Sequence, residues 1–455
     1  MNKFIEYIKN YTAGKNICIL GFGREGKSTY KILAQYCLPK KIAIADLNPV
    51  DRDKNSIPQT VEIITGENYQ EFLDSFDIVF KSPGIVLKKS PSELKCTVSC
   101  ETQVFFEVFR DQIVGITGTK GKSTVTSLIY HILQNSGRNC RIAGNIGIPV
   151  FDIAENMTDD TTVVCELSCH QLEYMSVSPK TAVFLNLYEE HLDHYGTLDN
   201  YFNAKKNIYL HQHNGDILYC NSEIIPRNVN TEIISVSLND VSADLTANDG
   251  KIFLNNTLVY TIPLNKIKLL GVHNHYNIAI AYGVCRKLGI TNNEFTEALC
   301  SFTPLAHRLE YVDTVNGVRY YDDSISTACA TAVEAIKSVP NAGTILIGGM
   351  DRGIDYTPLV EFLMHSDVQV VCMEASGKRI YNMMKSADFS DISRIHYADH
   401  LCDAVRLAAE ITPNGKSCIL SPAAASYGIF KNFEERGDAF KAYVAQLKDN
   451  QNGVI

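Results

Sequence analysis

The sequence predicts an α/β protein in which mostly parallel sheets form three domains. Apolar, β-rich runs alternate with helical patterns along the chain, which is typical of parallel sheets covered by helices. The chain also has 455 residues, which is more than one hydrophobic core usually supports. We expect the domains to span residues 1–103, 104–303 and 304–455.

The composition excludes several classes of protein. The formal net charge is -9 and no long basic run is present, so a nucleic-acid groove is not expected. No apolar stretch reaches membrane-spanning length, and the amphipathic segment Met1–Tyr11 lacks the apolar run of a signal peptide. The 14 cysteines form no C-x-x-C pair, which favours free thiols. We therefore expect a cytoplasmic protein without membrane insertion.

The first domain is predicted to be Rossmann-like, with strands at 17–20, 42–45 and 78–80. The turn Gly21–Gly26 reads G-F-G-R-E-G after the first strand, and Asp46 ends the next one. This spacing matches a dinucleotide-binding fingerprint, so a nicotinamide-dependent dehydrogenase is one hypothesis. However, the turn specifies only a diphosphate, and a UDP-sugar fits equally well. The second turn of this domain, Lys81–Ile85, is as consistent with a plain loop as with a ligand site.

The second domain begins with the most informative segment of the chain. The expected strand Ile113–Ile116 leads into Gly118–Thr124, which reads G-T-K-G-K-S-T, and then into an apolar helix. Such a turn directs backbone N–H groups at a phosphate. Lys122 can reach the β- and γ-phosphates, and the Ser123 hydroxyl can hold Mg²⁺. Although Ile116 replaces the first glycine of the strict motif, the segment predicts a nucleoside-triphosphate site.

Polar residues follow the next two expected strands. Glu166 follows strand 162–165, and its carboxylate is suited to complete a magnesium site. His191 follows strand 182–185 and could bind a metal or orient a phosphate. At the ends of strands beside a phosphate loop, both residues are more consistent with function than with isolated polar positions.

Weaker signals complete the second and third domains. Asn145 lies in a turn that could touch a phosphate or sugar, and composition alone makes Lys205 an ordinary helix lysine. Short alternating runs over 217–262, separated by Asn, Asp and Gly, predict a small antiparallel β insert. Strands at 344–347, 368–372 and 418–420 predict a Rossmann-like third domain.

Several motifs together resemble those of the Mur ligase family, and the resemblance covers essentially the whole chain. They are Gly118–Thr124, Glu166–Glu173 (E-L-S-C-H-Q-L-E), His191–Asp193 (H-L-D), Gly271–Asn277 (G-V-H-N-H-Y-N), His307–Glu310 (H-R-L-E) and Asp322–Ser324 (D-D-S). The most specific match is Leu420–Gly437, which resembles the segment that holds the incoming glutamate in one branch of the family.

The resemblance implies an ATP-dependent ligase with UDP-binding, ATPase and amino-acid-binding domains, in that order. The implied reaction adds D-glutamate to UDP-N-acetylmuramoyl-L-alanine through an acyl phosphate, giving ADP and phosphate, in peptidoglycan precursor synthesis. ATP and two Mg²⁺ ions are the implied cofactors, and we expect a monomer. The diphosphate turn of the first domain is then expected to hold UDP rather than NAD.

The resemblance also implies roles for individual residues. The catalytic residues are Lys122, Glu166, His191, Lys205, Arg308 and Asp323. The ATP contacts are Gly118, Thr119, Lys120, Gly121, Lys122, Ser123, Thr124, Asn274, Arg308 and Asp323. The UDP-substrate contacts are Gly21, Phe22, Gly23, Arg24, Asp46, Ser82, Pro83, Gly84, Asn145, Ser168 and Gln171. The glutamate contacts are Thr327, Arg352, Ser426, Tyr427 and Phe433. The metal ligands are Ser123, Glu166, His191 and Lys205, the last as its carbamate, because a carbamate offers the oxygen that an ammonium lacks.

Three positions near the expected glutamate pocket depart from the family pattern. Ile325 replaces a lysine after the D-S pair, Arg352 replaces the lysine of G-G-x-D-K-G, and Tyr427 replaces a leucine. Arginine can still bind a carboxylate in a bidentate way. L-glutamate or another amino acid therefore remains an alternative to D-glutamate. A non-catalytic UDP-sugar sensor is disfavoured, because all four implied catalytic residues of the second domain are present.

Overall fold

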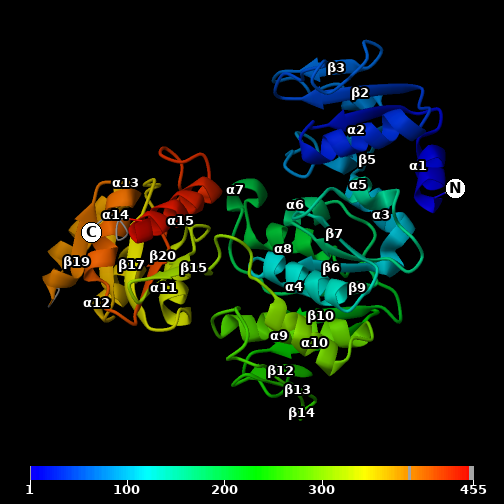
Figure 1. The fold of residues 1–455 in the computed structure, drawn as a ribbon. Helices are drawn as coiled ribbons and strands as arrows, with labels where there is room; N and C mark the ends of the chain where they lie inside the picture. Colours follow the sequence, from blue (N-terminus) through cyan, green and yellow to red (C-terminus); the bar gives the residue numbers. More distant parts are fainter. Residues whose placement is uncertain (1, 388–390, 450–455) are drawn as a thin grey trace. The chain divides into compact units, whose positions relative to one another are not determined.

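The computed structural model describes residues 2–387 and 391–449 (Figure 1). Within them the strands form sheets of five, nine and six strands, and each sheet falls within one predicted domain range. The chain divides into two compact units. The first contains residues 1–264 and 275–301, and the second contains 265–274 and the residues from 302 onward. The α/β fold class is confirmed, whereas the domain boundaries stay a prediction.

The N-terminal sheet is entirely parallel. In spatial order its strands are β3 (Glu62–Thr65), β2 (Lys41–Asp46), β1 (Asn16–Leu20), β4 (Ile78–Lys81) and β5 (Thr97–Ser99). Its helices are α1 (Lys3–Thr12), α2 (Arg24–Tyr36) and α3 (Glu101–Phe109). Since β2 and β4 flank β1, the turns after β1 and β4 lie at the switch point where such sheets bind ligands.

The central sheet carries the phosphate loop between β6 and α4. In spatial order its strands are β14 (Thr257–Thr261), β13 (Lys251–Leu254), β12 (Leu245–Asn248), β11 (Glu232–Ser237), β10 (Ile217–Asn221), β9 (Thr181–Phe184), β6 (Ile113–Thr117), β8 (Thr162–Glu166) and β7 (Cys140–Gly144). Its helices are α4 (Lys122–Asn135), α5 (Val150–Ala154), α6 (Cys169–Leu172), α7 (Leu192–Tyr195), α8 (Leu198–Lys206), α9 (His273–Lys287) and α10 (Asn292–Ser301).

The predicted antiparallel insert is only partly confirmed. Strands β12, β13 and β14 pair antiparallel, as expected. The prediction was wrong for β10 and β11, because β10 pairs parallel with β9 and β11 pairs parallel with β10. The segment therefore extends the central sheet, and β11 also pairs parallel with β12. The frequent turn residues around these short strands favoured antiparallel hairpins. The parallel pairing of β10 depends on β9, a distant strand that the local sequence does not indicate.

One hydrophobic core joins the N-terminal and central sheets within the first unit. It contains Ile17 of β1 and Ile113 of β6, both almost completely buried. Helix α1 contributes Phe4, whose ring centroid lies 5.0 Å from that of Phe151 in an edge-to-face arrangement. The amphipathic N-terminus is thus a helix with one face in this core.

The C-terminal sheet, in the second unit, is parallel except at one edge, where β15 pairs antiparallel with β16. In spatial order its strands are β15 (Glu310–Val315), β16 (Val318–Asp322), β20 (Ser417–Leu420), β17 (Ala342–Gly348), β18 (Gln369–Met373) and β19 (Ile395–Ala398). Its helices are α11 (Cys329–Ser338), α12 (Thr357–Met364), α13 (Glu374–Ser386), α14 (Leu401–Ile411) and α15 (Phe433–Asp449).

Short 3₁₀ helices complete the secondary structure. They are η1 (Leu73–Ser75), η2 (Pro91–Glu93), η3 (Arg110–Gln112), η4 (Ser222–Ile224) and η5 (Ile392–Arg394). Among the described helices, none combines the length and the apolar character that crossing a bilayer requires.

Candidate active site

The phosphate loop has the backbone geometry that its glycines predict. Gly118 and Gly121 have φ values of 152° and 85°, and Gly121 immediately precedes α4. A Cβ on Gly118 would lie 2.8 Å from the Cβ of Leu185. Glycine is therefore required at Gly118 for space as well as for conformation. The first-turn N–H groups of α4, which has no side-chain cap, are suited to bind an anion.

Asn186 holds this loop in place, and the sequence analysis missed it. Its Oδ1 accepts hydrogen bonds from the backbone N–H groups of Thr119 (3.1 Å) and Lys120 (2.8 Å). Its Nδ2 donates to the carbonyl oxygen of Lys120 at 3.0 Å. The only available signal was the position of an asparagine just beyond a strand of the same sheet. The side chain thus holds the loop from the segment that follows the neighbouring strand β9.

Two lysines converge on the loop. Lys122 Nζ donates to the carbonyl oxygens of Gly118 and Thr119, both at 2.9 Å. Lys205, on α8, also donates to the Gly118 oxygen at 2.9 Å and is only 1% exposed. Burial, followed by the charge of Lys122, lowers the pKa of Lys205 to about 7. Lys205 is therefore not the solvated lysine that its composition suggested, and it loses its proton at lower pH than an exposed lysine does.

Glu166 presents a buried carboxylate oxygen beside the loop strand. The side chain is 1% exposed and Oε1 accepts a hydrogen bond from Asn145 Nδ2 at 2.7 Å. Oε2 is buried and has no hydrogen-bond partner among residues 2–387 and 391–449. A buried carboxylate oxygen is costly unless something pairs with it. The chemistry of Oε2 therefore fits a divalent cation.

His191 is the N-cap of the short helix α7 and has a left-handed backbone conformation, with φ of 57°. Its ring centroid lies 5.1 Å from that of His170 and 6.0 Å from that of Tyr201, which is on α8. A positive φ is uncommon for histidine and often marks a functional position. The residues predicted to hold a metal thus come from α4, β8, α7 and α8, all in the first unit.

The two N-terminal turns at the switch point contact each other. Gly21 has φ of 89°, and a Cβ there would lie 2.8 Å from the Cβ of Ser82. Ser82 Oγ donates to the Gly21 carbonyl oxygen at 2.8 Å. The carboxylate of Asp46 accepts from the Phe22 N–H at 2.7 Å. The structure therefore places four of the predicted UDP contacts together at one edge of the sheet.

Further predicted UDP contacts link this edge to the central sheet. Arg24 Nη2 donates to the carbonyl oxygen of Asn145 at 3.1 Å. Gln171 Nε2 donates to Glu25 Oε1 at 2.8 Å, and Ser168 caps α6 by accepting from the Gln171 N–H. The side-chain amide of Asn145 also donates to Glu166, so this one residue connects the two predicted sites through its backbone and its side chain. Glu25 was missed, because the glycine-rich pattern places no requirement on that position.

Asp323 is the most buried of the predicted residues in the second unit. It follows β16 and accepts hydrogen bonds from Ser421 Oγ at 2.8 Å and the Leu309 N–H at 3.2 Å. Burial raises the pKa of its carboxyl to about 6. Arg308 is exposed on the turn before β15, and Asn274 Nδ2 donates to the Leu270 carbonyl oxygen.

The predicted glutamate contacts lie on loops after the parallel strands of the C-terminal sheet. Ser426 is buried in the loop after β20, whereas Thr327, Arg352 and Tyr427 are exposed. Phe433 begins α15, and its ring packs edge-on against His307 at 6.0 Å. Loops at the carboxyl ends of such strands are the usual ligand-binding edge.

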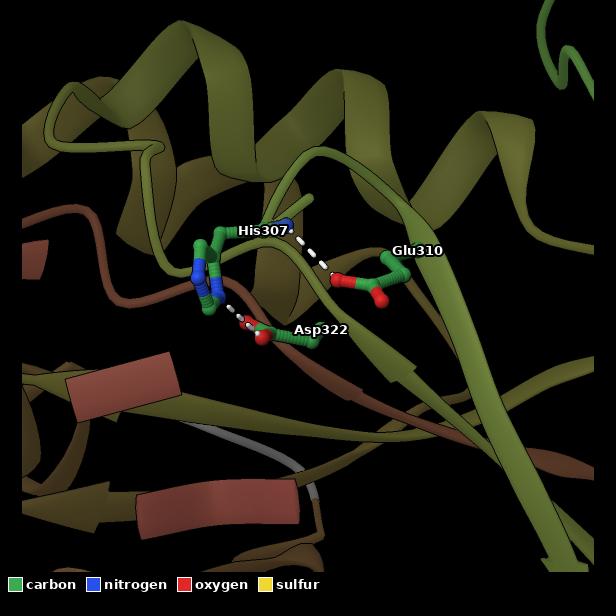
Figure 2. A group of neighbouring side chains, drawn as sticks. All are labelled: His307, Glu310 and Asp322. Carbon is green, nitrogen blue, oxygen red and sulfur yellow. Dashed lines mark hydrogen bonds and ion pairs between the residues drawn. The ribbon is translucent and has the colours of Figure 1, made fainter. Parts of the chain in front are cut away.

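A cluster of ionisable side chains supports the turn that carries Arg308. Figure 2 shows His307 joined by one dashed line to Glu310 and by another to Asp322. His307 Nδ1 lies 2.7 Å from Asp322 Oδ2, and the His307 N–H donates to Glu310 Oε2 at 2.8 Å. Lys441 Nζ already lies 2.7 Å from Glu310 Oε2. Because both carboxylates have cationic or N–H partners, we interpret the cluster as structural rather than as a metal site.

Arg436 is a third residue to which the sequence analysis assigned no role, although it lies in the Leu420–Gly437 motif. It is fully buried, and its guanidinium donates to Ser324 Oγ (3.0 Å), the Ser324 carbonyl oxygen (2.9 Å) and the Ala424 carbonyl oxygen (3.0 Å). The guanidinium thus ties the loop after β16 to the loop after β20. A planar guanidinium suits this fork of acceptors better than a lysine does.

Comparisons with known proteins show which proteins this chain is similar to. A family model described as the Mur ligase middle domain matches residues 116–285. A UDP-N-acetylmuramoylalanine–D-glutamate ligase from Ligilactobacillus salivarius is 32% identical and covers 96% of this chain and 97% of its own length. One with the same name from Clostridium kluyveri is 31% identical and covers 98% of this chain and 100% of its own length.

Solved structures support the same fold. The UDP-N-acetylmuramate–alanine ligase MurC from Thermotoga maritima has a TM-score of 0.61 at 16% identity, covering 96% of this chain and 100% of that chain. The MurF ligase from Thermotoga maritima, solved in complex with ADP, has a TM-score of 0.59 at 16% identity, covering 98% and 100%. Since the two relatives exceed 30% identity over nearly the whole chain, this protein belongs to the Mur ligase family.

Proposed function

We propose that the chain is an ATP-dependent ligase that joins D-glutamate to UDP-N-acetylmuramoyl-L-alanine. Relatives with that name align over nearly its full length. The observation that carries the proposal is the convergence of Lys122 and Lys205 on the Gly118 carbonyl oxygen. A phosphate loop that only binds a nucleotide needs the first lysine. A second, buried lysine suits a site that must neutralise or coordinate additional charge.

The first chemical step makes an acyl phosphate. A carboxylate oxygen of the L-alanyl group attacks the γ-phosphorus of ATP, the bond to the β–γ bridging oxygen breaks, and ADP leaves. Lys122 and the N–H groups of Gly118–Thr124 bind the phosphate oxygens and stabilise their charge. Magnesium supplies further charge neutralisation when bound. The residues that would hold it are Ser123, Glu166, His191 and Lys205.

The second step forms the amide. The amino nitrogen of glutamate attacks the acyl carbonyl carbon, the C–O bond to phosphate breaks, and the departing phosphate takes the amine proton. The residues proposed to contact glutamate are Thr327, Arg352, Ser426, Tyr427 and Phe433, and Asn274, Arg308 and Asp323 are proposed to contact ATP. Arg352 is exposed on its loop, where its guanidinium can pair with a carboxylate.

Lys205 is proposed to act as a carbamate. Its neutral amine attacks CO₂, a C–N bond forms, and one proton is released. The pKa of about 7 supports this reaction, because only the unprotonated amine is nucleophilic. The product replaces a cation with a carboxylate-like anion. It thereby converts a lysine that repels Mg²⁺ into a ligand for it.

The UDP group is proposed to bind at the N-terminal switch point. Gly21, Phe22, Gly23, Arg24, Asp46, Ser82, Pro83 and Gly84 form the two turns there and the adjoining strand end. Asn145, Ser168 and Gln171 extend the proposed site toward Glu166. The hydrogen bonds through Arg24 and Gln171 support this continuity. A nicotinamide dehydrogenase would leave the phosphate loop without a role.

Phosphate release tests the proposal. The chain is incubated with ATP, Mg²⁺ and UDP-N-acetylmuramoyl-L-alanine, and D- or L-glutamate is added in separate reactions. We expect phosphate release and an amide product only with D-glutamate. Release with L-glutamate alone would correct the substrate, and release with neither would reject the ligase.

A further inference from the structure

A buried chain of polar side chains joins three segments of the first unit. Lys81 Nζ lies 3.5 Å from Glu173 Oε2, and Glu173 Oε1 lies 3.4 Å from His194 Nε2. The side chains of Lys81, Glu173 and His194 are 3%, 16% and 10% exposed, respectively. We call these three residues the bridge. Each one comes from a different element of the fold.

Each end of the bridge lies beside a proposed binding segment. Lys81 ends β4 and directly precedes the Ser82–Gly84 turn, and its Nζ also donates to the Pro83 carbonyl oxygen at 3.2 Å. Glu173 follows α6. His194 lies on α7, one turn after His191. The bridge therefore runs from a proposed UDP-substrate turn to a proposed metal-ligand helix.

Helix α7 depends on such contacts for its position. It has four residues and begins at a left-handed residue, so its own hydrogen bonds contribute little stability. The ring of His170 on α6 packs 4.5 Å from that of His194 and 5.1 Å from that of His191. The Glu173–His194 contact and the ring contacts therefore both hold α7 against α6. Of the two, the Glu173 contact also reaches Lys81 beside the substrate turn.

Stability alone is a poor explanation for the bridge. Replacing a buried ion pair by apolar or neutral groups is often neutral or stabilising, whereas removing one partner leaves an uncompensated charge. Lys81 also donates to the Pro83 carbonyl oxygen, which places the pair in direct contact with that turn. We propose that the bridge couples substrate binding at the Ser82–Gly84 turn to metal binding through His191, with Glu173 as the positioning residue. This inference rests on the proposed function.

The test measures the coupling directly. Mn²⁺ binding to the full chain is titrated by calorimetry, with and without saturating UDP-N-acetylmuramoyl-L-alanine. In the wild type we expect the substrate to tighten Mn²⁺ binding by about 5-fold to 10-fold, within the usual range of coupling. Glu173→Gln and Lys81→Met are expected to reduce this factor to about one, and Lys81→Arg to restore most of it. Glu62→Gln is the matched control, because it breaks an exposed pair with Lys41 in the same domain.

Thermal unfolding separates coupling from stability. The double variant Lys81→Met/Glu173→Gln lacks an uncompensated charge, so it is expected to unfold near the wild-type temperature and still to lack coupling. If either single variant is poorly folded, the effect of the substrate on Mn²⁺ affinity is measured in the double variant and in His194→Gln instead. Independent binding of substrate and Mn²⁺ in the wild type, or retained coupling in the folded double variant, would overturn the bridge alone. Failure of the wild type to bind the UDP substrate would overturn the proposed function and the bridge with it.

Discussion

Lys122 and Lys205 donate hydrogen bonds to the same backbone oxygen, that of Gly118, at 2.9 Å each. One lysine belongs to the phosphate loop, and the other comes from α8, more than eighty positions later in the chain. Two ammonium groups this close repel each other, which helps to lower the pKa of the more buried one. The arrangement makes Lys205 chemically distinct from every solvated lysine of the chain.

Removing the Lys205 amine should abolish most of the ligase activity. We expect Lys205→Ala to lower kcat by about 100-fold or more, as for loss of a group that supports a metal. Acetate or formate should restore part of the activity, because a small carboxylate can occupy the space of the carbamate. The measurement is phosphate release against carboxylate concentration. Lys206→Ala is the neighbouring control. If a salt without a carboxylate raised the phosphate release of both variants equally, the result would contradict a carbamate at Lys205.

The lowered pKa of Lys205 also predicts how stability depends on pH. The unfolded chain keeps this lysine protonated up to about pH 10.4, whereas the folded chain loses the proton from about pH 7. Because the unfolded state binds more protons in this window, stability should rise with pH between about 7 and 10, by up to ~1.4 kcal/mol per unit. Denaturant unfolding in CO₂-free buffer should show this rise relative to Lys205→Met. If the free energy of unfolding depended on pH in the same way in the wild type and in Lys205→Met, the lowered pKa of Lys205 would be refuted.

The clamp at Asn186 should matter for nucleotide binding. Asn186→Ala removes three side-chain hydrogen bonds to the loop backbone, so the loop loses contacts that fix its conformation. We expect the KM for ATP to rise about 10-fold, since each lost hydrogen bond costs on the order of 1 kcal/mol. The KM for the UDP substrate should change little. Asn203→Ala, at an exposed site where the side chain accepts a hydrogen bond from Lys206, serves as the control, and an effect of equal size there would count against the clamp.

Local patterns were sufficient to predict much of the fold. The strand–turn–helix units around Gly21 and Gly118 were evident because glycine, apolar strands and helix starts are encoded within a few residues. The pairing of β10 with β9 was not, because it joins segments more than thirty positions apart. Nothing in the short runs after position 217 distinguishes a parallel extension of the sheet from an antiparallel insert.

The site was predictable only where a motif carries it. Glu166 and His191 follow strands, and the parallel topology brings such ends to one edge of the sheet. The burial of Lys205 comes from the packing of α8 against the loop, which no local pattern encodes. Asn186 and Arg436 act through backbone groups of distant segments. Their roles therefore appear only when the chain is folded.

Two glycines of the N-terminal turn offer a matched pair of substitutions. A Cβ on Gly26 would lie 2.0 Å from the Gly21 carbonyl oxygen, whereas a Cβ on Gly23 would meet no atom within 4 Å. Gly26→Ala should therefore lower the free energy of unfolding by about 1–3 kcal/mol through overpacking. Gly23→Ala should leave the unfolding temperature near that of the wild type, because its φ of -73° suits alanine.

The same pair tests where the diphosphate binds. If the turn holds the UDP substrate, its backbone must approach the diphosphate closely, and the added methyl group of Gly23→Ala obstructs that approach. We expect this variant to bind UDP-N-acetylmuramoyl-L-alanine at least about 10-fold more weakly, a cost of ~1.4 kcal/mol, while the KM for ATP stays unchanged. Calorimetric titration with the substrate gives the affinity, and thermal unfolding confirms the fold. Wild-type affinity in a folded Gly23→Ala variant would place the diphosphate away from this turn, because the introduced methyl group meets no protein atom and can be felt only by a ligand.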